Sequence, residues 1–169
     1  MSAIKIKMLV LDVDGTLTDA SIYYGDNNLE IKAFNAKDGM TILAFIRLGV
    51  DVIFLTGRRS EAVERRAKAL GATAIQGCMD KLPRLRELLL GHGIKPEECA
   101  YIGDDINDYA AMKICGFKGC PADAAIEIRG ICDYVSSVKG GHGAVRDICE
   151  YILKQNGKYV DFLKFWGVE

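Results

Sequence analysis

The apolar stretch of residues 8–13 ends in two closely spaced carboxylates. Asp12 and Asp14 lie at positions i and i+2, and Gly15 follows at once. The stretch is short, partly β-branched and apolar, which predicts a strand that is buried on both faces. Since side chains at i and i+2 of a strand point the same way, we expect Asp12 and Asp14 to lie side by side near its carboxyl end. Two adjacent negative charges are unfavourable unless a cation or a shared proton relieves them, and carboxylate oxygens suit Mg²⁺.

Two simpler interpretations of this segment must be weighed. Asp and Gly after a strand often form only a turn. A calcium loop of the EF-hand type is excluded, because the Gly of such a loop comes later and its last ligand is a Glu. Counting from Asp12, Gly15 is the fourth residue and Tyr23 is the twelfth. The other polar groups of the chain therefore decide between a turn and a functional site.

Two further predicted strands end in polar groups. The strand predicted at residues 51–55 ends in Thr56 and Gly57, and Lys81 begins a later helix. The strand predicted at residues 100–102 is followed by an acidic cluster, made of Asp104, Asp105 and Asp108. Taken alone, Thr56 and Gly57 would form a turn and Lys81 would be a solvated helix residue. Because the carboxyl ends of parallel strands meet at one edge of a sheet, we expect these groups to form one site.

Strands and helices alternate along the chain. Strands are predicted at residues 8–13, 51–55, 73–76, 100–102, 117–120 and 134–135. Helices are predicted at residues 38–49, 60–70, 81–90, 108–114, 124–129 and 144–155. Asp38 is the predicted N-cap of the first helix. The pattern predicts an α/β fold with a doubly wound, mainly parallel, Rossmann-like sheet, and we expect residues 1–169 to form a single domain.

Two segments fall outside this alternation. Residues 19–35 contain two β-prone runs around the turn residues 25–28, which predicts a small hairpin flap beside the carboxylates. The tail, residues 157–169, is rich in aromatic residues. A free tail of this kind would be an exposed apolar patch. The tail is therefore expected either to pack on its own subunit or to contribute to an assembly.

The composition limits the partners of the protein. The net charge is −1 at pH 7, which implies no general attraction to nucleic acid or to an anionic membrane. No apolar run approaches the ~18 residues of a membrane span. The six cysteines form no Cys-x-x-Cys pair, and no signal peptide is predicted. We therefore expect free thiols and a cytoplasmic location.

Four segments resemble, in order and spacing, the motifs of phosphatases of the haloacid dehalogenase (HAD) superfamily: DVDGTLTD, LTGR, Lys81 and GDDINDY. A phosphoryl group in transfer carries charge on its oxygens, so such a site supplies cations and hydrogen-bond donors. The resemblance implies that Asp12 attacks phosphorus, and that Asp14 protonates the leaving alkoxide and then activates water. It also implies catalytic roles for Thr56 and Lys81. Mg²⁺ would be bound by Asp12, Asp104 and the backbone carbonyl of Asp14.

The same resemblance implies roles for neighbouring positions. Supporting roles fall to Asp105, Asn107 and Asp108. Contacts to the phosphate or the substrate fall to Gly15, Thr56, Gly57, Arg58, Arg59, Arg66 and Lys81. Independently of the resemblance, four arginines follow the Thr56 turn: Arg58, Arg59, Arg65 and Arg66. They either form a solvated helix face or include at least one that binds a substrate carboxylate, which a guanidinium can do through two hydrogen bonds.

The flanking segments, within residues 4–155, resemble a small cap-less branch of the superfamily: YIGDDINDYAAM, GCPADA, DYV and GGHGAVRD. This branch dephosphorylates 3-deoxy-D-manno-octulosonate 8-phosphate (KDO 8-phosphate), an eight-carbon sugar-acid phosphate. Relatives act on nine-carbon analogues, the 9-phosphates of KDN and N-acetylneuraminate. Arg59 favours the eight-carbon substrate, because some nine-carbon relatives have Glu there, whereas GGHG also suits the nine-carbon relatives. The branch is tetrameric, which implies a homotetramer whose core is built from the hairpins and whose sites are completed by neighbouring chains.

Three other classes of protein remain as alternatives. A phospho-acceptor signalling domain would lack Asp14 and would be shorter. A non-catalytic regulatory domain would not need every catalytic residue that this chain keeps. A phosphomutase needs a cap to keep water from the aspartyl-phosphate, whereas the segment between Asp14 and Thr56 has room for the hairpin and one helix. We therefore predict a Mg²⁺-dependent phosphomonoester hydrolase.

Overall fold

One six-stranded sheet forms the centre of the computed structural model, which describes residues 6–27 and 29–169. Its strands are β1 (Met8–Leu11), β4 (Asp51–Leu55), β5 (Thr73–Ile75), β6 (Cys99–Ile102), β7 (Phe117–Cys120) and β8 (Tyr134–Val135). Their order is β5-β4-β1-β6-β7-β8, and every pair is parallel. Met8 pairs with Asp51 on one side and Cys99 on the other. The carboxyl ends of β1, β4 and β6 are therefore adjacent.

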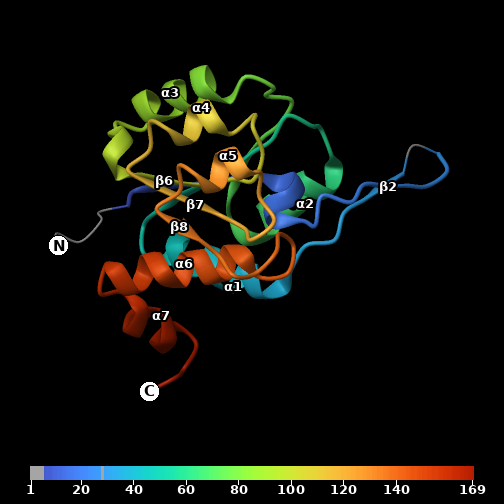
Figure 1. Cartoon of the computed structure of the whole chain (residues 1–169). Helices are drawn as coiled ribbons and strands as arrows, with labels where there is room; N and C mark the ends of the chain where they lie inside the picture. The colour runs from blue at the N-terminus through green and yellow to red at the C-terminus, as the bar shows by residue number, and fades with distance from the viewer. Residues whose placement is uncertain (1–5, 28) are drawn as a thin grey trace.

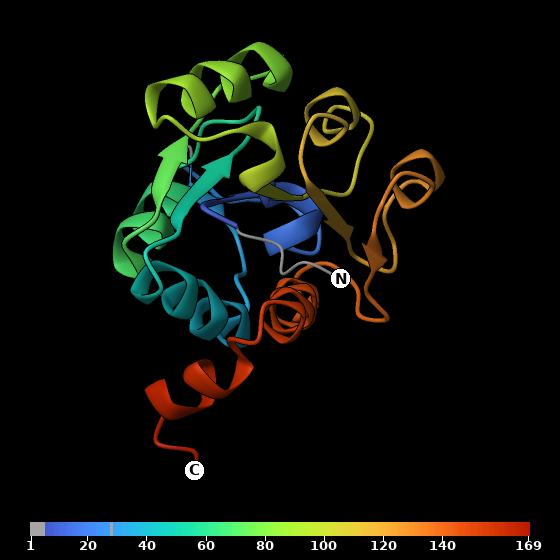
Figure 2. The ribbon, with the colours of Figure 1, turned by 90° about the vertical axis from the view of Figure 1, so that its left-hand side faces the viewer.

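Helices cover both faces of the sheet, as Figures 1 and 2 show. One face carries α1 (Ala36–Arg47), α2 (Glu61–Leu70) and α6 (Ala144–Gln155), and the other carries α3 (Lys81–Gly91), α4 (Tyr109–Met112) and α5 (Ile126–Arg129). Strand β1 contributes side chains to the hydrophobic core on both faces of the sheet. Leu9 and Leu11 pack on the first face, and Met8 and Val10 pack on the second. All four side chains are fully buried. The predicted doubly wound parallel sheet is thus confirmed.

The start of α1 differs from the prediction. Its N-cap is Asn35, whose side chain accepts a hydrogen bond from the Lys37 amide at 2.8 Å. Asp38 lies inside the first turn and is buried, so the predicted capping role of Asp38 for this helix is wrong. Instead, its carboxylate accepts a hydrogen bond from the Arg146 amide at the start of α6, at 2.8 Å. Asp38 thus joins the amino-terminal turns of two helices.

The predicted hairpin is present and projects from the body of the domain (Figure 1). It consists of β2 (Tyr23–Tyr24) and β3 (Glu30–Ile31), which pair in an antiparallel manner. The Gly25 amide donates a hydrogen bond to the Leu29 carbonyl at 2.8 Å. Of the predicted turn, residue 28 lies outside the described part of the chain. Between β1 and β4 the described residues contain this hairpin and α1, with no separate cap domain.

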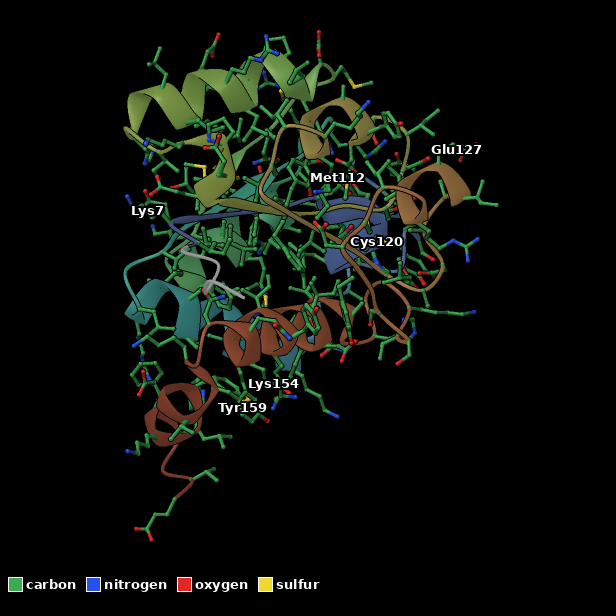
Figure 3. All side chains as sticks on the ribbon, turned by 60° about the vertical axis from the view of Figure 1, so that its left-hand side comes forward. Lys7, Met112, Cys120, Glu127, Lys154 and Tyr159 are labelled. Atoms are coloured by element: carbon green, nitrogen blue, oxygen red, sulfur yellow. The ribbon has the colours of Figure 1, made fainter. Side chains whose placement is uncertain are left out.

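The tail forms a helix, α7 (Tyr159–Phe165), that packs on its own chain against α1 and α6. Phe162 is buried, and the Lys154 ammonium of α6 lies 4.5 Å from the centre of the Tyr159 ring, a pair labelled in Figure 3. Of the two expectations for the tail, packing on its own subunit is the one that the structure shows. A short 3-10 helix (Pro96–Glu98) precedes β6. Among the described residues, no helix combines the length and apolar character that crossing a bilayer requires.

Candidate active site

A pocket of about 210 Å³ lies at the carboxyl ends of β1, β4 and β6. It is lined by Asp12, Asp14, Thr56, Gly57, Arg58, Met79, Asp105, Ile106 and Asn107. Most of the residues singled out from the sequence therefore meet at one edge of the sheet. The parallel pairing of β1 with both β4 and β6 explains why, because each of these strands delivers the residues that follow it to the same edge.

The two carboxylates of the first motif line the pocket but have different partners. Strand β1 ends at Leu11, and a tight turn over Val13–Leu17 follows. Asp12 contacts the Lys81 ammonium, whereas Asp14 contacts the Lys32 ammonium. The strand therefore ends before the predicted bound at residue 13, but Asp12 and Asp14 both line the same pocket, as expected. Their different partners give the two carboxylates separate electrostatic surroundings.

Gly15 is required where the turn approaches the second acidic cluster. Its φ of +108° lies in the region that favours glycine. A Cβ at this position would lie 2.0 Å from Oδ2 of Asp104, so no other residue leaves room for that carboxylate. The neighbouring Thr16 hydroxyl donates a hydrogen bond to Oδ1 of Asp104 at 2.8 Å. Gly15 and Thr16 thereby hold the first and fourth motifs in contact.

Lys81 is buried between two carboxylates. Its ammonium contacts Asp12 and lies 2.6 Å from Oδ1 of Asp108. Lys81 and Asp108 are both essentially inaccessible to solvent. Oδ1 of Asp108 also accepts a hydrogen bond from the Tyr101 hydroxyl at 2.8 Å, and its Oδ2 accepts the Asp104 amide at 3.2 Å. Asp108 therefore positions both Lys81 and the loop that carries Asp104.

The pKa values of the site reflect burial and crowding of negative charge. Burial, and then the nearby Asp108, raise the pKa of Asp12 well above its ordinary range. Burial is also the main reason that the pKa of Asp104 rises to about 6. Burial lowers the pKa of Lys81, but the carboxylates of Asp12 and Asp108 outweigh it and raise that pKa above its ordinary value. One lysine thus faces three carboxylates, an excess of negative charge that a divalent cation would balance.

The acidic groups fit a magnesium ion. Asp12, Asp104 and Asp108 each offer a carboxylate oxygen, and these oxygens lie within 4.8 Å of one another. Asp108 already bonds to Lys81, Tyr101 and the Asp104 amide, so Asp12 and Asp104 are the better candidates for direct ligands. The donors are all hard oxygens, which suit Mg²⁺. The third ligand that was predicted, the carbonyl of Asp14, stays a prediction.

The candidate phosphate and substrate contacts divide into two groups. Thr56 is buried at the pocket, and its hydroxyl accepts the Arg58 amide at 3.2 Å. Arg58 also lines the pocket, and its guanidinium pairs with Glu30 at 3.1 Å. Arg59 and Arg66 do not belong to the lining of this pocket. Arg66 instead donates a hydrogen bond at 3.1 Å to the backbone carbonyl of Asn35, just before α1. The side chain of Arg59 is exposed to solvent.

Several residues of the site were not anticipated from the sequence. Lys32, which contacts Asp14, and Glu30, which pairs with Arg58, both come from the hairpin. Their positions at i and i+2 around the exposed Ile31 were an available signal, because alternate residues of a strand share a face. Tyr101 is a second case, since a hydroxyl within an otherwise apolar buried strand needs a polar partner. The structure supplies Asp108 as that partner.

The fold and the site together define a phosphatase of the HAD type. The family model described as haloacid dehalogenase-like hydrolase matches residues 36–116. Known relatives align with more of the chain than the family model does. The chain is 43% identical over 157 residues to the 3-deoxy-D-manno-octulosonate 8-phosphate phosphatase of Yersinia pestis, and the alignment spans 92% of this chain and 84% of that protein. The corresponding enzyme of Escherichia coli K12 is 42% identical over 154 residues, spanning 90% and 82%.

Solved structures give the same result. The Moraxella catarrhalis enzyme of this name, in complex with a magnesium ion, a phosphate ion and KDO, is 40% identical. It superposes with a TM-score of 0.93 over 97% of this chain and 95% of its own. The Yersinia pestis structure is 42% identical with a TM-score of 0.90, covering 94% and 86%. This chain belongs to the family of 3-deoxy-D-manno-octulosonate 8-phosphate phosphatases, within the haloacid dehalogenase-like hydrolases.

Proposed function

We propose that this enzyme hydrolyses 3-deoxy-D-manno-octulosonate 8-phosphate to the free sugar acid and inorganic phosphate, with Mg²⁺ as its metal. The observation that supports this most is the combination of family and site. Relatives of that name are 43% identical over 92% of the chain. Around one pocket, the chain keeps the two carboxylates of the first motif, Thr56, Lys81 and the acidic loop that Asp108 positions.

Asp12 is the nucleophile of the proposed reaction. One of its carboxylate oxygens forms a bond to phosphorus while the bond from phosphorus to the sugar oxygen breaks, which leaves an aspartyl-phosphate. The buried Lys81 ammonium beside Asp12 balances negative charge on the carboxylate and on the phosphoryl oxygens. Thr56, at the end of β4, offers its hydroxyl to the same oxygens. When Mg²⁺ is bound by Asp12 and Asp104, it supplies additional positive charge against the phosphoryl group.

Asp14 handles the protons in both steps. In the first step its carboxylic acid gives a proton to the leaving sugar oxygen. In the second step the resulting carboxylate takes a proton from the water that attacks the aspartyl-phosphate, and Asp12 is released with inorganic phosphate. The different partners of Asp12 and Asp14 suit this division, because the two neighbouring carboxylates perform different tasks.

Arg58 is the proposed contact for the substrate carboxylate. Among the described residues it is the arginine that lines the pocket, and planar guanidinium groups bind carboxylates through two hydrogen bonds. The substitution Arg58→Ala should raise KM for the sugar-acid phosphate and leave kcat little changed. Arg65→Ala is the matched control, because Arg65 is an exposed arginine of α2. An unchanged KM in the Arg58 variant would show that the carboxylate is bound elsewhere.

A phosphate-release screen tests the substrate. The purified enzyme with Mg²⁺ is offered the eight-carbon 8-phosphate, the 9-phosphates of KDN and N-acetylneuraminate, and p-nitrophenyl phosphate. The highest kcat/KM is expected for the eight-carbon compound. A higher value for a nine-carbon compound would reassign the substrate, and no phosphate release from any of them would refute the phosphatase activity.

A homotetramer is the proposed assembly. The hairpin leaves large apolar side chains exposed, with Tyr24 71% accessible and Leu29 and Ile31 each 51% accessible. A two-stranded hairpin is marginally stable alone, so a second chain covering this surface would stabilise it. Met79 and Ile106, at the pocket, are also exposed and offer a place for a neighbouring hairpin. Light scattering should give about four times the chain mass of 18.5 kDa, and Ile31→Ser should lower it. A fully active monomer would contradict the assembly.

A cytoplasmic location is also proposed. All six cysteines are free thiols, which is typical of proteins that work in a reducing compartment. Cell fractionation should recover the activity with cytoplasmic markers, and recovery from an oxidising compartment would contradict the proposal.

A further inference from the structure

The hairpin carries a buried lysine into the active site. Lys32 directly follows β3, and its side chain is inaccessible to solvent. Its ammonium contacts Oδ1 of Asp14. Removing a lysine ammonium from water is costly unless the charge is paired and hydrogen-bonded. The partner that balances this charge is the residue that transfers the protons in the proposed reaction.

A second carboxylate completes the surroundings of Lys32. Oε1 of Glu30 lies 3.6 Å from the Lys32 ammonium and has no hydrogen-bond partner among the described residues. The other oxygen of Glu30 lies 3.1 Å from the guanidinium of Arg58, a residue of the pocket lining. Arg58 in turn donates a hydrogen bond to the Tyr24 hydroxyl of the hairpin at 2.7 Å. A chain of alternating charges therefore runs from Asp14 to the wall of the pocket.

The contact leaves half of the Asp14 carboxylate available. Oδ1 is occupied by Lys32, whereas no hydrogen bond from the described part of the chain reaches Oδ2. Asp14 lines the pocket and retains 18% of its side-chain accessibility. One oxygen is thus anchored while the other is free to exchange a proton with a bound substrate. Such anchoring reduces the orientational freedom that the carboxylate would otherwise have to lose in the transition state.

We propose that Lys32 is a positioning residue for Asp14: its ammonium holds one carboxylate oxygen, so that the other oxygen is oriented toward the pocket for proton transfer to the substrate. The inference rests on the proposed phosphatase reaction. In the first step the Asp14 proton moves to the leaving oxygen as the bond from phosphorus to that oxygen breaks and the Asp12–phosphorus bond forms. Lys32 keeps its own proton throughout and contacts no reacting atom.

This role predicts a particular dependence on the leaving group. An alkoxide is a poor leaving group and needs the proton of Asp14, whereas a nitrophenolate leaves without it. Losing the support of Lys32 should therefore slow the hydrolysis of alkyl phosphates far more than that of activated aryl phosphates. A lysine that only held the hairpin in place would instead affect all substrates by the same factor.

The experiment compares Lys32→Met, Lys32→Arg and the control Lys37→Met, an exposed lysine of α1. For each protein with Mg²⁺, kcat/KM is measured for the sugar-acid phosphate and for a series of aryl phosphates whose leaving groups differ in pKa. This parameter reports the steps through formation of the aspartyl-phosphate. The slope of its logarithm against leaving-group pKa does not depend on how much of a variant is folded, because unfolded enzyme lowers every rate equally.

For Lys32→Met we expect kcat/KM to fall about 100-fold or more on the sugar-acid phosphate and less than about 10-fold on p-nitrophenyl phosphate. The slope should become steeper, Lys32→Arg should lie between Lys32→Met and the unaltered protein, and Lys37→Met should match the unaltered protein. An unchanged slope in Lys32→Met overturns the proposal. If Lys32→Met yields no folded protein, the same comparison of slopes is made with Lys32→Arg. If the unaltered enzyme does not hydrolyse the sugar-acid phosphate, the proposed substrate is wrong, and the aryl phosphate series still tests the role of Lys32.

Discussion

Replacing Gly140 should impair catalysis although this residue is far from Asp12 in the sequence. Gly140 lies in the loop before α6, which packs against the turn that follows β1. A Cβ on Gly140 would lie 1.8 Å from the carbonyl oxygen of Gly15. Real Cβ atoms do not approach other heavy atoms within 3.0 Å, so Gly140→Ala must separate the two loops by at least about 1.2 Å. The turn that would move is the one that carries Asp14 and Gly15 beside Asp12.

The size of the effect follows from this displacement. Misplacing a catalytic group by about 1 Å can cost about 100-fold in rate, so kcat of Gly140→Ala should fall by about that factor. Overpacking should also lower the free energy of unfolding by about 1–3 kcal/mol. Gly91→Ala is the matched control, because a Cβ there, at the end of α3, meets no atom within 4 Å.

The assay is hydrolysis of 3-deoxy-D-manno-octulosonate 8-phosphate at saturating Mg²⁺, with kcat divided by the folded fraction from a thermal unfolding curve. This correction separates a displaced turn from general loss of folded protein. The reasoning would be refuted if the corrected kcat of Gly140→Ala lay within about twofold of that of Gly91→Ala.

Four further predictions follow from the site and from Asp38. Asp12→Asn removes the nucleophilic charge and should lower kcat by orders of magnitude, so a near-normal rate would contradict the mechanism. Lys81→Met leaves buried carboxylates unpaired and should lower the free energy of unfolding by about 3–5 kcal/mol in urea titrations, and a neutral effect would argue against the ion pair. Chelation should abolish turnover and Ca²⁺ should not restore it, whereas Mg²⁺ should raise the unfolding temperature; activity after exhaustive chelation would exclude the metal. Burial raises the pKa of Asp38 to about 6, so the folded protein binds this proton more tightly than the unfolded chain does. The free energy of unfolding should therefore fall by up to about 3 kcal/mol between pH 4 and pH 7 relative to Asp38→Asn, and parallel pH curves for the two proteins would contradict this.

Local patterns in the sequence were sufficient for most elements of the fold. The apolar runs that became β1, β4 and β6 were recognisable because strands buried on both faces have few polar residues. Helix α6 has the predicted bounds. The end of β1, just before Asp12, was harder to predict from the sequence, because the strand is followed by a tight turn whose conformation depends on contacts with a distant loop. The start of α1 was misplaced for a related reason: Asp38 resembles an N-cap, but its partner is the amide of Arg146 in another helix.

The sequence by itself determined the class of chemistry. Carboxylates and a threonine follow the buried strands, and a lysine begins a later helix; in a parallel sheet the ends of such strands meet at one edge, so these residues indicate a phosphoryl-transfer site. The tertiary structure alone decided which charges meet. It placed Lys81 between Asp12 and Asp108, brought Lys32 from the hairpin to Asp14, and left Arg58 at the pocket. Such pairings join residues that are distant along the chain. Strand and helix periodicities report only which face a residue occupies, whereas an ion pair depends on how separate elements pack in three dimensions.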